Sequence, residues 1–247
     1  MEGVGLTMGV LRGVPRRFAI PNDCLTCTLR QSSDFCNLPH PLMAAFNATG
    51  HVTLYPSHAT LLTEGQMPRG VYIACSGRAK LAIAARDGKT IILKIAGGRH
   101  VLGLSSVLLG QPSPVTVTTI ELCQIKFVER DAFLELIEGN GHAAIACAKM
   151  LAEEALSAFD DVHELLLARS STEKLARLLL SWVAGEPRNR ELRVFTEFTH
   201  EEIAQMIGSS RETVTRLLSD MKRKDLIRVE GTTLVIPNRI ALQAIAA

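Results

Sequence analysis

Long hydrophobic runs are missing from this chain of 247 residues, because no segment offers 18 uninterrupted apolar residues. A membrane-spanning helix needs about 20 predominantly apolar residues, so we expect no membrane contact. The opening stretch, Met1–Ile20, combines glycines with arginines and lacks the apolar centre of a secretory signal peptide. These absences predict a cytoplasmic protein.

Catalytic signatures are also missing. The sequence contains no HExxH motif, no recognisable Ser/His/Asp arrangement and no glycine-rich loop that would hold phosphates. Gly97-Gly98 alone is too short to count as such a loop. We therefore predict that the protein is not an enzyme. A cysteine-dependent redox enzyme with an attached DNA-binding domain remains the alternative.

Six cysteines are present, too few for a disulfide scaffold in a chain of this length. Three of them, Cys24, Cys27 and Cys36, lie within 13 residues. In a reducing compartment such a group favours metal binding or redox chemistry over a static disulfide. The Cys-x2-Cys pair suits an iron–sulfur cluster or zinc. A thiol–disulfide switch without metal is a third possibility.

Short β-rich runs separated by turn residues occupy residues 51–128. Asp87-Gly88 between two apolar runs indicates a hairpin. Evenly spaced short strands predict a small barrel or jelly roll. The predicted strand runs are 71–75, 79–83, 90–95 and 114–127.

Two cysteines lie apart from the N-terminal group. Cys75 alternates with Val71 and Ile73 in a predicted strand, and Cys147 stands among alanines in a predicted helix. Buried free cysteines behave as small apolar residues. Both are therefore predicted to be packing residues.

Residues 141–168 lack proline and are rich in Ala, Leu, Glu and Met, which predicts a helix about 42 Å long. One small barrel cannot cover such a helix, so we expect a second chain to pack along it. The next helix is predicted over 173–183, with Thr172 as its cap. The expected dimerisation residues are Ile145, Leu151, Leu156, Phe159 and Val162.

The overall net charge of +2 conceals a basic C-terminal part, since residues 169–247 carry 13 Lys/Arg against 10 Asp/Glu. Within it, Thr199 and Glu202 form a capping box that begins a short helix. Gly208 permits a tight turn, and Ser209 with Glu212 is predicted to cap a second helix. Two short helices across such a turn indicate a helix-turn-helix.

The second of these helices directs Val214, Leu217, Leu218 and Met221 inward and leaves polar side chains on its outer face. Arginine can pair with guanine and glutamate with cytosine, so this face predicts base reading. A solvated helix end with a Glu212–Arg216 pair is the alternative. Leu226–Ile236 reads as a hairpin that turns at Glu230-Gly231, the wing of a winged helix. The predicted DNA contacts are Ser210, Arg211, Glu212, Thr215, Arg216 and Lys222.

The stretch Ile207-Gly-Ser-Ser-Arg-Glu-Thr-Val-Thr-Arg216 resembles the cAMP receptor protein / fumarate-nitrate reduction regulator (CRP/FNR) family. Ser76-Gly77-Arg78 and Glu173-Lys-Leu-Ala-Arg177 extend this resemblance over nearly the whole chain. It implies an α+β fold with a β-roll (jelly-roll, cyclic-nucleotide-binding-like) domain, a long dimerisation helix and a winged helix-turn-helix domain. The implied domains are an arm with the cysteine loop (1–50), the β-roll (51–138), the dimerisation helix (139–168) and the DNA-binding domain (169–247).

Family members are homodimeric transcription factors that bind roughly palindromic DNA and contact RNA polymerase. In the cAMP-responsive branch, the residues that match Arg211, Glu212 and Arg216 read a TGTGA-type half-site. The oxygen-sensing branch usually lacks the first arginine, which this sequence has. The resemblance therefore implies a homodimer on palindromic double-stranded DNA with TGTGA-like half-sites.

The resemblance also bears on the signal. The cyclic-nucleotide branch uses a Glu and an Arg to hold the ligand phosphate, and neither occurs in His100–Val115. We therefore expect no cyclic nucleotide. In the oxygen-sensing branch a β-roll cysteine joins three N-terminal ones, and Cys123 matches it. The implied cofactor is a [4Fe–4S] cluster held by Cys24, Cys27, Cys36 and Cys123 that senses oxygen or nitric oxide. The alternative is a thiol-redox or zinc-containing regulator, since the Cys27–Cys36 spacer is longer than in the best-known member.

Overall fold

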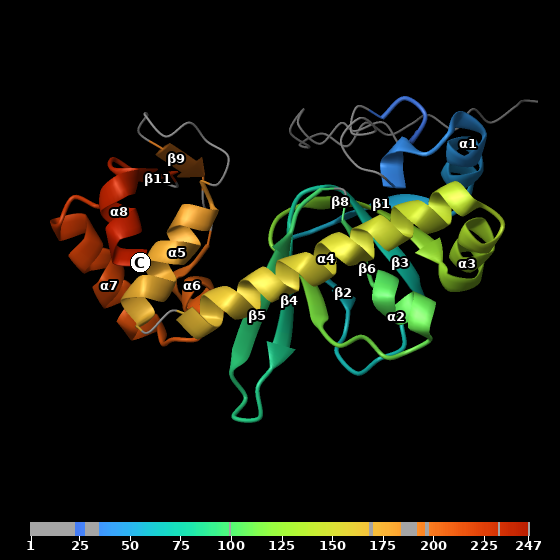
Figure 1. Cartoon of the computed structure of the whole chain (residues 1–247). Helices are drawn as coiled ribbons and strands as arrows, with labels where there is room; N and C mark the ends of the chain where they lie inside the picture. The colour runs from blue at the N-terminus through green and yellow to red at the C-terminus, as the bar shows by residue number, and fades with distance from the viewer. Residues whose placement is uncertain are drawn as a thin grey trace, which may run out of the picture. The chain divides into compact units, whose positions relative to one another are not determined.

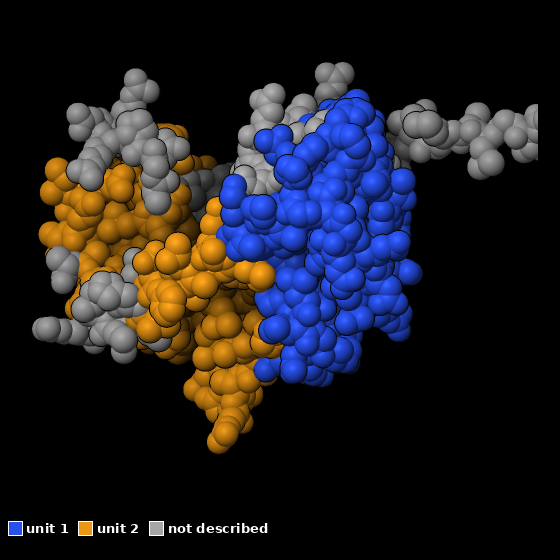
Figure 2. Space-filling view, turned by 45° about the vertical axis from the view of Figure 1, so that its right-hand side comes forward, with its two compact units in different colours: residues 1–79, 96–113, 117–149 blue, residues 80–95, 114–116, 150–247 orange. Residues whose placement is uncertain are grey.

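The computed structural model describes residues 23–27, 35–98, 100–167, 170–183, 192–195, 198–231 and 233–246. The N-terminal arm up to residue 22 and the segment 184–191 lie outside the described residues. The chain divides into two compact units (Figure 2). The first comprises residues 1–79, 96–113 and 117–149, and the second comprises residues 80–95, 114–116 and 150–247.

The N-terminal half contains short strands interrupted by short helices, and the C-terminal half is mainly helical (Figure 1). In chain order the first elements are η3 (Phe35–Asn37), α1 (His40–Ala48), β1 (His51–Tyr55), β2 (Thr60–Leu62), β3 (Gly70–Ser76), β4 (Ala79–Ala84), β5 (Thr90–Ala96), β6 (Val101–Leu102), α2 (Leu104–Leu109), β7 (Thr116–Thr119), β8 (Cys123–Glu129) and α3 (Arg130–Glu138). They are followed by α4 (Gly141–Leu167), α5 (Ser171–Ser181), β9 (Leu192–Phe195), α6 (His200–Ile207), α7 (Arg211–Arg223), β10 (Arg228–Glu230), β11 (Thr233–Ile236) and α8 (Arg239–Ala246).

Two four-stranded sheets form the predicted roll, with the strand orders β1-β8-β3-β6 and β2-β7-β4-β5. Strands β3 and β8 are antiparallel, and Ile73 lies opposite Lys126. Their register shifts between Ala74 and Ser76, so Cys75 is the extra residue of a β-bulge. The predicted continuous run over 114–127 is broken, because the Ile120 amide turns away to donate to the Arg78 carbonyl at 2.9 Å.

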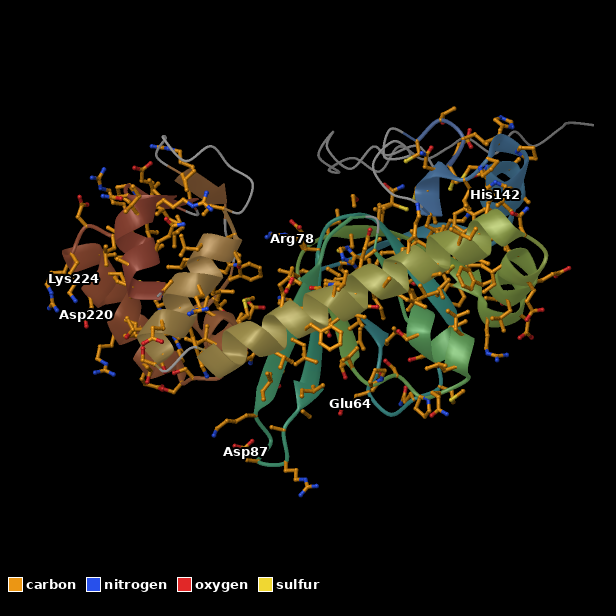
Figure 3. All side chains as sticks on the ribbon, viewed as in Figure 1. Glu64, Arg78, Asp87, His142, Asp220 and Lys224 are labelled. Carbon is orange, nitrogen blue, oxygen red and sulfur yellow. The ribbon has the colours of Figure 1, made fainter. Side chains whose placement is uncertain are left out.

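The predicted Asp87-Gly88 hairpin is confirmed at the tip of β4 and β5, where Figure 3 labels Asp87. Gly88 has a φ of 81°, which an L-residue rarely adopts, and its amide donates to the Ala85 carbonyl at 2.9 Å. The tip also carries an exposed ion pair of 2.8 Å between Lys89 and Asp87.

Aromatic side chains anchor the segment that carries Cys36 to the first unit. Phe35, immediately before Cys36, has no exposed surface. Its ring lies 5.2 Å from that of Phe46 on α1 and 5.8 Å from that of Phe133 on α3. Such contacts add to the burial of apolar area, so the backbone at Cys36 is held against two helices.

The C-terminal part contains α5 to α8 and the sheet β10-β11-β9 around one apolar core. Leu175, Leu179, Val214, Ile227 and Ile236 are among its fully buried members. The wing predicted at Glu230-Gly231 is confirmed as the β10–β11 hairpin. Strand β9 and helix α8 were not predicted from the sequence.

One predicted cap is wrong. The Ser170 hydroxyl, not that of Thr172, accepts the Glu173 amide at 3.1 Å and begins α5. Thr172 already lies inside the helix. A cap needs an extended backbone, and Ser170 has one, with φ −136° and ψ 156°.

Candidate nucleic-acid interface and cysteine site

Helices α6 and α7 are joined by the predicted tight turn. Thr199 accepts the Glu202 amide at 3.1 Å, and the Glu202 carboxylate accepts the Thr199 amide at 3.0 Å, so the capping box is confirmed. Gly208 closes α6 with a φ of 63°. The second cap differs by one residue from the prediction, because Ser210 and not Ser209 accepts the Thr213 amide, at 3.2 Å.

Helix α7 has a buried and an exposed face. Val214 has no exposed surface, and Leu218 and Met221 are only 5% and 2% exposed, so they fix the helix on the core. The six predicted DNA contacts are all exposed, namely Ser210, Arg211, Glu212, Thr215, Arg216 and Lys222. Polar side chains at the start of a second helix are what a base-reading helix presents.

Two interactions organise the exposed face. His200 Nδ1 lies 2.9 Å from Thr215 Oγ1, and that hydroxyl donates to the Arg211 carbonyl at 2.9 Å. The contact of His200 with Thr215 was not predicted from the sequence, since it joins two helices. Hydrogen bonds from its own amide and from Ser210 lower the pKa of Glu212, so this carboxyl is ionised at neutral pH. In the described part of the chain Glu212 and Arg216 form no ion pair with each other.

Basic residues end helix α7, after the exposed polar side chains of its first turns. Lys222, Arg223 and Lys224 end α7 and are exposed, and Figure 3 shows Asp220 and Lys224 at the outer edge of this helix. Arg223 pairs with Asp220 at 2.7 Å, which partly neutralises it. The lysines fit contact with the phosphate backbone, which gives affinity without sequence information.

Helix α4 carries an exposed apolar stripe. Ile145, Leu156, Phe159 and Val162 are 60%, 65%, 72% and 53% exposed, although all four are large apolar residues. Leu151, the fifth predicted dimerisation residue, is half-buried. Apolar side chains at this helical spacing, left open along a 27-residue helix, fit the surface of a second helix.

Three N-terminal cysteines lie near one β-roll cysteine. The pKa of the Cys75 thiol is raised to about 12, first by burial and then by the charges of Cys24, Cys36 and Cys27. A hydrogen bond from the Lys126 backbone acts in the opposite direction. The backbone of Cys24 is joined to α1 by the hydrogen bond from its amide to the Asn47 side chain, at 2.8 Å. Cys75 is only partly buried, unlike a core residue, because the bulge takes it out of the ladder.

Lys126 on β8 is a buried cation in the first compact unit. Its side chain is 2% exposed, its ammonium donates to the Asn47 carbonyl at 3.2 Å, and it lies 5.1 Å from the centre of the Phe46 ring. Burial lowers the pKa of Lys126, and the charges of Cys24 and Cys75 oppose that shift.

Cys123 lies in a different environment. Its side chain is 1% exposed, and its thiol donates to the carbonyls of Arg78 and Glu121, both at 3.3 Å. Burial and then the charge of Glu121 raise its pKa to about 11. An ion pair of 2.8 Å joins Arg78, labelled in Figure 3, to Glu121. Cys147 is buried in α4, where burial alone raises its pKa to about 11.

Among the residues that the structure describes, no three His, Cys, Asp or Glu side chains are close enough to hold one metal ion together. A single tetrahedral zinc ion binds each sulfur at about 2.3 Å and therefore needs tight convergence. A [4Fe–4S] cluster is larger and distributes four thiolates over its irons. Cysteine thiols are the donors that such a cluster uses, so the residue types present fit it.

Family models match both parts of the chain. The Crp-like helix-turn-helix domain matches residues 173–245, and the cyclic nucleotide-binding domain matches residues 52–140. A CRP-like cAMP-activated global transcriptional regulator of Mycobacterium tuberculosis is 30% identical over 193 residues, which cover 77% of this chain and 86% of that protein. The chain belongs to the CRP/FNR family. The cAMP-activated global transcriptional regulator CRP of Salmonella typhimurium is 25% identical over 202 residues, covering 79% of this chain and 94% of that protein.

Solved structures of CRP/FNR regulators share the fold. The c-di-GMP responsive global regulator CLP of Xanthomonas campestris superposes with a TM-score of 0.69 at 18% identity, covering 81% of this chain and 100% of that one. FixK2 of Bradyrhizobium japonicum gives 0.68 at 23% identity, covering 80% and 98%. The predicted fold class, an N-terminal β-sheet domain followed by a helix-turn-helix domain, is confirmed.

As a CRP/FNR family member, the protein is a DNA-binding transcription regulator. Its relatives are regulators rather than enzymes, in agreement with the predicted lack of catalytic function. Regulators of this family work as dimers on DNA. In the described part of the chain, no helix combines the length and the apolar character that crossing a membrane requires.

Replacing Arg216 with alanine is expected to weaken discrimination at one base position of the DNA site by about 1–3 kcal/mol, because a bidentate pair with a base is lost. Fluorescence anisotropy with single-base variants of the site measures this loss. Lys222→Ala is the matched control and should weaken binding uniformly and reduce its salt dependence. Equal losses for Arg216→Ala on the site and on random DNA would contradict base reading.

Proposed function

We propose that this CRP/FNR regulator is a homodimer that holds a [4Fe–4S] cluster and senses oxygen or nitric oxide. It binds palindromic DNA with TGTGA-like half-sites when the cluster is intact and contacts RNA polymerase there. The observation that carries this proposal is the hydrogen bond of the Cys24 amide to Asn47, whose own carbonyl accepts the buried Lys126 ammonium of the β-roll. Cys24, Cys27 and Cys36 would be three ligands, and Cys123 or Cys75 the fourth.

When bound, the cluster would supply sensitivity to oxidants. The chain's residues do the rest. Asn47 holds the backbone at Cys24, since its side-chain oxygen accepts the Cys24 amide at 2.8 Å. Phe35 holds the backbone at Cys36 through Phe46 and Phe133. Loss of thiolate ligation would leave these two contacts as the links between the cysteine segments and the rest of the first unit, and this loss would change the dimer equilibrium.

A cyclic nucleotide is not the proposed effector. The relatives named above are cAMP-activated, and the matched domain is a cyclic nucleotide-binding domain. A phosphate with a negative charge needs charge-assisted donors. Residues 100–115, which include α2, contain no arginine, lysine or glutamate. This composition supports a different signal.

A metal-free thiol switch is the second candidate, because all six cysteines are free. Thiol–disulfide exchange requires a thiolate, and a lowered pKa marks a reactive cysteine. The pKa of Cys75 is instead raised to about 12, so this thiol is protonated at neutral pH. A protonated Cys75 disfavours a switch that relies on its thiolate, and a metal ion that binds Cys75 has to displace the same proton.

The test is iron and sulfide analysis of protein prepared without oxygen, with DNA affinity measured before and after exposure to air. We expect brown protein with about four irons per chain. Air should remove the iron and lower affinity for the palindrome by about 5–150-fold, the range of a typical coupling free energy. Cys24→Ser should prevent iron uptake and give the low affinity without air.

Two outcomes would contradict the proposal. Colourless protein with one zinc per chain would favour the zinc-containing alternative. Iron-loaded protein whose DNA affinity and dimer mass do not change in air would exclude coupling between the cluster and DNA binding. Cys147→Ser is the control, since Cys147 is buried in α4 and burial is the only cause of its pKa shift.

A further inference from the structure

The β1-β8-β3 face that carries Lys126 is the starting point. Successive side chains of a strand point to opposite faces of its sheet. Cys123 and Lys126 are three residues apart in β8, which has no register shift against β1. They therefore project to opposite faces. The carbonyls that accept the Cys123 thiol belong to Arg78 and Glu121, whereas the partner of Lys126 is Asn47 on α1.

The N-terminal cysteines lie on the Lys126 side. Asn47 accepts the Cys24 amide through its side chain at 2.8 Å and the Lys126 ammonium through its carbonyl at 3.2 Å. One residue thus joins the backbone of Cys24 to the buried cation. Phe46, whose ring lies beside that ammonium, also packs on Phe35, next to Cys36.

Cys75 reaches the same side through the bulge. Ala74 pairs with Ile125 and Ser76 with Gln124, which leaves Cys75 without a partner residue on β8. A bulge redirects a side chain and interrupts the ladder. The Cys75 thiol donates to the Ile73 carbonyl at 3.7 Å, and Ile73 lies opposite Lys126, which places the sulfur at the Lys126 end of the face.

Cys123 is held in its own position. A side chain built at Gly77 would lie 2.6 Å from the Cys123 sulfur and 2.7 Å from the Leu122 carbonyl, so the thiol packs directly on the Gly77 backbone. Two backbone carbonyls accept its proton. For Cys123 to bind a metal on the Lys126 face of the sheet, strand β8 would have to rotate, and both carbonyls would lose the thiol proton that they accept.

We infer that Cys75, and not Cys123, is the fourth thiolate of the site formed by Cys24, Cys27 and Cys36, with Lys126 as its buried counter-charge. The inference rests on the proposed function and assigns the fourth cysteine ligand of the proposed cluster. A buried ammonium is costly unless opposite charge compensates it. Thiolates that carry an iron–sulfur cluster supply that charge, and nearby charge in turn tunes the reduction potential of the cluster.

The test compares Cys75→Ala with Cys123→Ala, the matched control from the adjoining strand. Metal-free chains of both variants and of the wild type are reconstituted with ferrous iron and sulfide without oxygen. Iron per chain and the visible spectrum are then recorded, and thermal unfolding of the metal-free chains confirms folding. We expect Cys75→Ala to lose the cluster and Cys123→Ala to retain it.

The opposite pattern, with iron retained by Cys75→Ala and lost by Cys123→Ala, would overturn the inference and leave the proposed function intact. Failure of the wild type itself to take up iron would instead refute the proposed function. If a variant does not fold, alkylation of wild-type cysteines followed by mass spectrometry decides. Loading with iron should then suppress modification of Cys75, and equal modification with and without iron would refute its role as a ligand.

Discussion

Phe159→Asp is expected to convert the proposed homodimer into a monomer. The ring is 72% exposed in the single chain and lies in the stripe with Leu156 and Val162. In a two-fold symmetric interface the change occurs in both copies, and a buried aromatic anchor contributes about 2–4 kcal/mol per copy. A loss of about 4 kcal/mol raises the dimer dissociation constant roughly 10³-fold.

Sedimentation or light scattering measures the mass, and anisotropy with the palindromic site measures the loss of DNA affinity. Glu154→Gln is the matched control, since Glu154 is exposed on the other side of α4 and its substitution also changes one charge. It should leave the dimer unchanged. A Phe159→Asp protein that retains the mass of a dimer would show that α4 does not form the interface through this stripe.

Val214→Asp is expected to unfold the DNA-binding part and abolish DNA binding. Val214 has no exposed surface and packs in the core of α5 to α8. A carboxylate at this position would be buried without a partner. Its burial costs several kcal/mol, which is a large fraction of the free energy of unfolding of a small domain. The first compact unit, residues 1–79, 96–113 and 117–149, should remain folded, since Val214 belongs to the second unit.

Differential scanning calorimetry should therefore lose the transition of the C-terminal part and retain that of the first compact unit. Ser219→Asp adds the same charge on the exposed face of the same helix and should change stability by at most about 0.5 kcal/mol. Retention of specific DNA binding by Val214→Asp would contradict the inward orientation of this residue.

Local signals in the sequence predicted the helix-turn-helix correctly. The Thr199–Glu202 box and the Gly208 turn depend on contacts within four residues, so the sequence contains all the partners. The two remaining caps were less certain, because Ser209 and Ser210 both satisfy the pattern, as do Ser170 and Thr172. The backbone conformation selects Ser210 and Ser170 as the N-caps. The neighbouring residues in the sequence do not predict that conformation.

Strand boundaries depended on distant partners. The run over 114–127 reads as one strand, yet the Ile120 amide bonds to Arg78, which is 42 residues earlier in the chain. His200 was missed as a partner of Thr215 for the same reason, since the contact bridges α6 and α7. Contacts of this kind follow from sheet register and helix packing, which the hydrophobic periodicity of the sequence does not predict.

The sequence by itself determined the family, the second helix of the helix-turn-helix with its six polar residues, and the group of Cys24, Cys27 and Cys36, because these features consist of residues close together in the chain. Only the tertiary structure distinguished the surroundings of the two β-roll cysteines, on which the inferred fourth ligand depends. Cys75 and Cys123 both lie in predicted strands, and the alternation of Val71, Ile73 and Cys75 indicated packing. Cys75 is the extra residue of a bulge opposite β8, whereas Cys123 donates to the Arg78 carbonyl and strand alternation directs it to the face opposite Lys126.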